Sequence, residues 1–270
     1  MLYYLFIRSV LPTHHICPPS SPPLHTLIPK QDILRTSYQY ASNRELWRSP
    51  RSTSTEPNRM IDKSLIQSTF VNYSETLSVI ATYIARVREK VAGCIVESAF
   101  PKHILEAVCI CKFVGTSVGV DAVSVMRKTL GSRALLEESK LGASSFVCNA
   151  TCAAEGDNTI MELKVVRDVV LGGWKSLFPI ALLIRCLQRG STRRVVWIYL
   201  CLVLQALWLG KLAMEDGQLL RDIAWARAHL LILDDWYVHG VKTYGGGTDA
   251  HRMGDSYAHV LARFPTPPQF

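Results

Sequence analysis

The apolar residues between positions 66 and 125 follow helical spacing in two long stretches. In the first stretch they recur at intervals of four and three residues, which places them on one face of a helix. This stripe consists of Ile66, Phe70, Tyr73, Leu77, Ile80, Ile84, Val87 and Val91. We expect Ala92 and Gly93 to end that helix. A second stripe follows Pro101, includes the small residues Gly115 and Ala122, and has the same spacing. Two such helices joined by a short turn predict an antiparallel, up-down bundle.

Further helices are expected towards the C-terminus. Thr159 and Glu162 have the T-x-x-E spacing of a capping box, so a third long helix should begin near Thr159. Apolar runs over 174–186, 195–214 and 219–238 predict three more helices. The stretch between the second and third long helices, 131–158, is less regular. No segment shows the alternation of a β-strand, so the predicted fold class is all-α.

The sequence divides into four parts. Residues 1–60 are rich in Pro, Ser and Arg without a sustained period, so we expect a disordered segment or a leader; a wrongly assigned start of the reading frame would look the same. Residues 61–172 form the predicted bundle, and 173–240 form an additional helical segment. Residues 241–270, with a triple glycine and several prolines, are expected to be a flexible tail.

The apolar run from Val195 to Leu209 raises the question of a membrane. A spanning helix needs about 20 apolar residues, and this run is shorter, with Gln205 inside it and Arg193 and Arg194 in front. A buried bundle helix is therefore favoured over a membrane span. Contact with one face of a membrane stays open.

Composition excludes some functions. The net charge of +8 is spread through the predicted helices and not gathered on one face, which favours a role in solubility, or an anionic ligand, over nucleic acid. The eight cysteines include no C-x-x-C pair and no suitably spaced histidines accompany them, so we expect reduced thiols and no metal site.

The residues just before the third long helix carry the candidate chemistry. At a helix start, unpaired N–H groups and the helix dipole favour anions. Gly156 would let the backbone approach a ligand closely, and Glu155 could take a proton from carbon. Asp157, Asn158 and Thr159 also suit plain helix capping.

The motif E-G-D-N-T at 155–159, followed by a helix, resembles the acyl-CoA dehydrogenase and oxidase superfamily, and its form is closer to the oxidase branch. Upstream, Lys112 and the helix leading into Gly131 are similar to a family helix that ends in a glycine-rich turn. The resemblance covers 62–172 and extends more loosely to the later helices.

This resemblance implies the C-terminal helical domain of a flavin-dependent enzyme that acts on acyl-CoA. Glu155 would be the base that removes the α-proton while the β-hydrogen leaves as hydride to FAD. The cofactor would be bound with the help of Gly131, Gly156, Asp157, Asn158 and Thr159. The resemblance further implies a truncated chain that needs N-terminal and β-domains as partners, in a mitochondrion or peroxisome. The alternative is a non-catalytic helical module that forms a homo-oligomer.

Two other polar groups are interpreted as structural. Tyr83, with Arg86 and Arg88, is expected on a solvated helix face. His229 and His239, near Asp234–Asp235, are expected on a polar face, with Trp225 and Trp236 packed opposite.

Overall fold

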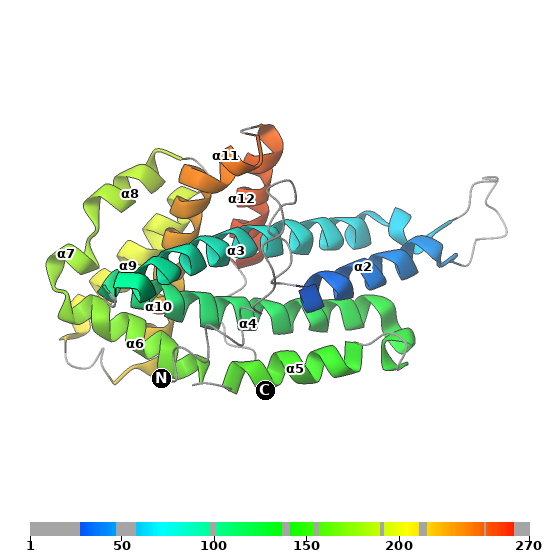
Figure 1. Cartoon of the computed structure of the whole chain (residues 1–270), viewed down its shortest axis with the longest axis horizontal. Coiled ribbons are helices and arrows are strands. Elements are labelled where there is room, and N and C mark those ends of the chain that lie inside the picture. The colour runs from blue at the N-terminus through cyan, green and yellow to red at the C-terminus, as the bar shows by residue number, and fades with distance from the viewer. Residues whose placement is uncertain are drawn as a thin grey trace.

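The computed structural model describes residues 28–46, 58–97, 101–136, 141–153, 157–189, 192–210, 215–245 and 247–261. Within these ranges the chain is helical, and its one extended contact is an isolated bridge between Glu45 and Arg59. The predicted all-α bundle is confirmed (Figure 1).

The two longest helices are α3 (Ser64–Glu97) and α4 (Lys102–Leu130), and they run along the length of the molecule (Figure 1). The predicted stripe of α3 is buried, as shown by Tyr73 and Leu77, each 1% exposed. α3 does not end at Gly93, as the sequence suggested, but continues to Glu97. A single glycine costs a helix only about 1 kcal/mol, which the packing of so long a helix outweighs.

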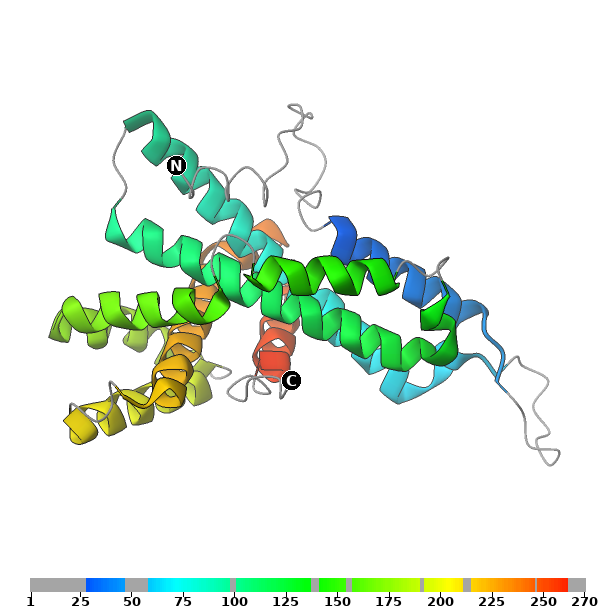
Figure 2. The same ribbon diagram turned by 90° about the horizontal axis from the view of Figure 1, so that it is seen from below.

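Helices from both sides enclose α4. It packs against α3, α2 (Ile28–Asn43), α5 (Leu141–Ala153) and α6 (Asn158–Leu171). α10 (Gly217–Asp235) crosses this layer (Figure 2). It contacts α6, α8 (Ile180–Leu187) and α9 (Arg193–Leu209). Among the described residues, α4 with its C-terminal extension to Ala134 is the one helix long and apolar enough to cross a membrane, and 61% of its most apolar window is buried inside the protein.

Two segments expected to be disordered or flexible contain helices. α2 lies within 1–60 and buries Ile33 and Ala41. α12 (Thr248–Leu261) lies within 241–270 and packs along α3. Its polar contacts are specific, because Arg252 Nε donates to Glu75 Oε1 at 2.9 Å and Ser256 Oγ donates to Glu75 Oε2 at 2.5 Å. Neither segment has a long periodic run of apolar residues, so contacts with other helices stabilise α2 and α12.

The additional helical segment has its own apolar core. α7 (Trp174–Leu177) and α8 (Ile180–Leu187) replace the single helix predicted over 174–186, because Pro179 interrupts it. α9 (Arg193–Leu209) packs on α8 and α10 through Val196, Tyr199 and Val203. A π-helical turn, Trp236–Gly240, and α11 (Val241–Thr243) continue α10.

Candidate functional site

The junction between α5 and α6 is fastened to α4 by one buried lysine. Lys112, 3% exposed, donates from Nζ to the carbonyl oxygens of Thr151 at 2.5 Å and Cys152 at 3.1 Å. The same nitrogen donates to Asn158 Oδ1 at 3.1 Å. A cationic donor at the last carbonyls of a helix is favourable, because those groups have no partner within the helix. Lys112 therefore joins the end of α5 to the start of α6.

Asn158 completes this contact from the other side. Its Nδ2 donates to Thr116 Oγ1 at 2.9 Å and to Ser117 Oγ at 3.0 Å, both on α4. The side chain is buried, at 8% exposure, and both of its polar atoms are engaged. A contact of Asn158 with a cofactor stays a prediction, and its side chain could make one only by giving up these partners. We call Lys112, Thr116, Ser117 and Asn158 the α4 clasp.

Asp157 is the N-cap of α6. Its Oδ1 accepts from the backbone N–H of Thr159 at 3.1 Å. The predicted capping box of Thr159 and Glu162 is therefore wrong: the helix begins one residue earlier, and Glu162 faces another helix. The carboxylate of Asp157 remains exposed, and the side chain of Thr159 is half-buried.

Glu162 holds α6 against α10. Its Oε2 accepts from Arg221 Nε at 2.8 Å, and its Oε1 accepts from the indole of Trp225 at 3.0 Å. Burial raises the pKa of Glu162 above its usual value, although Arg221 and Trp225 act in the opposite direction. The beginning of α6 is thus fixed on both sides, by α4 and by α10.

Two of the predicted site residues, Glu155 and Gly156, lie outside the described residues. The described chain stops at Ala153 and resumes at Asp157. The clasp holds the residues on both sides of this interval, since Lys112 contacts Cys152 and Asn158.

Gly131 lies elsewhere. It is the C-cap of α4 with φ of 61°, in the left-handed region that favours glycine. It is 15 residues beyond Thr116 on the same helix, which corresponds to about 22 Å at the usual helical rise. Gly131 and Asp157 therefore cannot contact the same phosphate group. Binding of a cofactor by Gly131, Asp157 or Thr159 stays a prediction.

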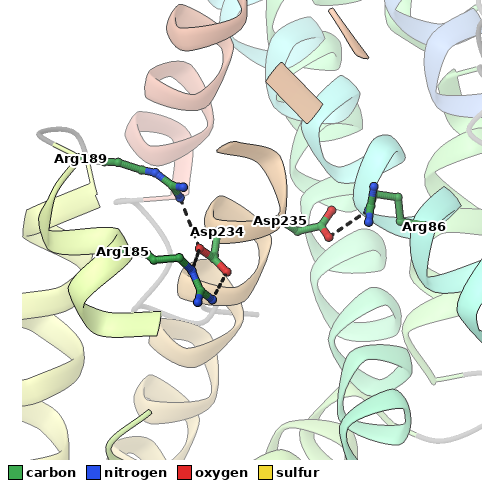
Figure 3. A network of polar contacts seen from close by, with 5 residues as sticks. All are labelled: Arg86, Arg185, Arg189, Asp234 and Asp235. Atoms are coloured by element: carbon green, nitrogen blue, oxygen red, sulfur yellow. Dashed lines mark hydrogen bonds and ion pairs between the residues drawn. The ribbon is translucent and has the colours of Figure 1, made fainter. Parts of the chain in front are cut away.

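Three of the other polar residues singled out from the sequence, Arg86, Asp234 and Asp235, form ion pairs inside the protein. Figure 3 shows that Asp234 and Asp235 face opposite sides: Asp234 accepts from Arg185 at 2.7 Å on α8, and Asp235 accepts from Arg86 at 3.1 Å on α3. These ion pairs of Asp234 and Asp235 hold α10 between α8 and α3.

Tyr83 is buried, contrary to the solvated face expected, and burial raises its pKa well above the usual value.

His229 is also buried, contrary to the polar face expected. Its ring centre lies 5.6 Å from that of Trp225, so the two residues share one side of α10, where the sequence analysis placed them opposite each other. Its Nδ1 is 3.4 Å from the hydroxyl of Tyr257. Its Nε2 is buried without a hydrogen-bond partner, and burial lowers the pKa of His229 to about 3.

The helix α5 and the partners of Asn158 were not found from the sequence. Apolar spacing gave no sign of α5, because it buries few side chains, among them Leu141 and Cys148. Thr116 and Ser117 sit between apolar residues of α4 and have no motif of their own. A polar pair between apolar residues of the central helix was the available signal.

Comparison with known proteins gives likeness in structure alone. No protein-family model matches the sequence, and no curated protein matches it. An acyl-CoA dehydrogenase complexed with FAD from Bacillus anthracis has a TM-score of 0.65 and 15% identity, over 87% of this chain and 44% of that chain. Acyl-CoA oxidase 1 of Arabidopsis thaliana has a TM-score of 0.65 and 18% identity, over 87% and 41%. Acyl-CoA oxidase 3 of Yarrowia lipolytica has a TM-score of 0.60 and 15% identity, over 91% and 44%.

At sequence identities of 15–18%, the structural similarity shows that the chains share a fold. The chain has the helical fold found in part of these acyl-CoA dehydrogenase and oxidase structures, and it spans less than half of their length.

Proposed function

We propose that this chain forms the helical part of a flavin-dependent acyl-CoA dehydrogenase or oxidase, with Glu155 as the base that removes the α-proton of the acyl-CoA. The α4 clasp is the observation that carries the proposal. Lys112 and Asn158 tie the chain on both sides of the three residues 154–156 to the central helix. A catalytic base needs such fixed supports, because displacement by about 1 Å can cost a hundredfold in rate. The likeness in fold to an acyl-CoA dehydrogenase and two acyl-CoA oxidases supports the same assignment.

To act as this base, Glu155 needs a pKa above the ordinary value of a carboxyl group. The α-proton of a thioester is weakly acidic, and a carboxylate with the reference pKa of about 4.3 is a poor base for it. Bound acyl-CoA would add desolvation, which raises a carboxyl pKa. We propose that substrate binding makes Glu155 basic enough to act.

Solvent exchange at the α-carbon tests this role without depending on hydride transfer. The chain is incubated in D2O with FAD and a saturated acyl-CoA, and loss of the α-proton signal is followed by NMR. We expect exchange above the uncatalysed rate, and loss of it by a factor of about 100 or more in Glu155→Gln, the usual contribution of a general base. Glu89→Gln, on an exposed position of α3, is the matched control and should exchange like the wild type. Unchanged exchange in Glu155→Gln, or none in folded wild-type protein, would overturn the proposal.

A further inference from the structure

The outer face of α9 is apolar and uncovered within the described chain. Trp197 is 63% exposed, Leu204 58% and Trp208 86%, and Cys201 is exposed between them. These positions follow one another at intervals of four, three and four residues, so they form one stripe along the helix. The opposite face of α9 is the one that packs on α8 and α10. α9 thus carries two apolar faces, one buried and one open to solvent.

The charged residues in the sequence around this face are all basic. Residues 169–214 contain six Lys and Arg residues and no Asp or Glu. The six are Lys175, Arg185, Arg189, Arg193, Arg194 and Lys211. Arg194 precedes Trp197 by three residues and therefore lies on the exposed stripe. Arg185 and Arg189 share one acidic partner, Asp234 of α10, so their combined charge is only half balanced.

A second copy of the chain is a poor occupant of this face. A helix of 17 residues is about 25 Å long and about 10 Å wide, so its face projects about 250 Å². A stable protein interface takes about 800 Å² from each partner. Pairing two copies here would also bring two basic segments together, which is unfavourable. A lipid surface needs no matching protein area, and its acidic head groups complement the charge.

We propose that α9 binds the surface of an anionic phospholipid membrane. The helix lies in the plane of the surface, with Trp197, Leu204 and Trp208 among the head groups and upper acyl chains. Arg194 contacts lipid phosphates at the same level. The helix does not cross the bilayer, because its other face remains packed on α8 and α10. Tryptophan and arginine suit this depth, since each combines an apolar part with a polar one.

Vesicle flotation tests the proposal with the chain as it is. Binding to vesicles of phosphatidylcholine with phosphatidylserine is compared with binding to phosphatidylcholine alone. We expect binding to the acidic vesicles, weakened by salt, and a shift of tryptophan emission to shorter wavelength. The double variant Trp197→Ser/Trp208→Ser should bind about tenfold or more weakly. Arg194→Gln should bind about fivefold more weakly.

The matched control is Phe146→Ser on α5, since Phe146 is 76% exposed but lies on another helix. It should bind like the wild type, and circular dichroism checks that all variants are folded. Absence of binding to acidic vesicles overturns the proposal. So does equal binding to neutral vesicles, or an equal loss in Phe146→Ser. Light scattering that finds a dimer abolished by Trp208→Ser would assign the face to a second copy instead.

Discussion

Replacing Lys112 by methionine should show how much the α4 clasp contributes to stability. Methionine keeps most of the side chain's length and apolar contacts but removes all three donated hydrogen bonds. The Thr116 hydroxyl lies 3.1 Å from Asn158 Oδ1 and 2.8 Å from the Lys112 carbonyl oxygen, so its single proton can be donated to either. The carbonyls of Thr151 and Cys152 belong to residues that are exposed or half-buried, so water can reach them in part. At about 1 kcal/mol for each lost bond, we expect the free energy of unfolding to fall by about 2–3 kcal/mol.

Urea unfolding followed by circular dichroism measures this change. Lys128→Met is the control, because Lys128 is an exposed residue of the same helix; its effect should stay within about 0.5 kcal/mol. Adding Asn158→Ala to Lys112→Met should cost less than the sum of the two single changes, since the residues share a hydrogen bond. A loss under about 0.5 kcal/mol in Lys112→Met would refute the view that the clasp holds α5 and α6 together.

Two further predictions concern α10 and the turn after it. Burial lowers the folded-state pKa of His229 to about 3, so below pH 6.5 the unfolded chain binds a proton there and the folded chain does not. The free energy of unfolding therefore falls by about 2 kcal/mol between pH 7 and pH 5. In urea titrations at both pH values, His229→Phe should abolish this pH dependence and the exposed His103→Phe should leave it; an unchanged pH dependence in His229→Phe would contradict the assigned burial. Gly240→Ala should destabilise by about 1–3 kcal/mol in the same assay, because the new Cβ would lie 2.3 Å from the ring of the buried Trp236. Gly93→Ala, with nothing within 4 Å, should instead stabilise by up to about 1 kcal/mol, and a gain in Gly240→Ala would refute the predicted clash.

Periodicity predicted the elements that bury a continuous stripe. α3, α4, α9 and α10 were all expected near their observed positions, because each buries an apolar face along most of its length. α2, α5 and α12 were missed for the opposite reason. Each is amphipathic over a short range or buries few side chains, and contacts with α3 and α4 stabilise them.

The candidate site was predicted only in outline. The sequence placed 155–159 at the start of a helix, and α6 does begin at Asn158. It did not assign Asn158 to α4, because that contact joins residues 41 to 46 positions apart and depends on how α5 turns back. The role of Glu155 remains a prediction.

The contact between α12 and α3 has a consequence for how the protein folds during synthesis. Glu75 receives its partners Arg252 and Ser256 from 177 and 181 residues later in the chain. At translation rates of about 5–20 residues per second, Arg252 and Ser256 are synthesised about 10–40 s after Glu75. During this interval α3 exposes the side on which α12 will pack. The chain therefore completes this part of its core only once α12 has been synthesised.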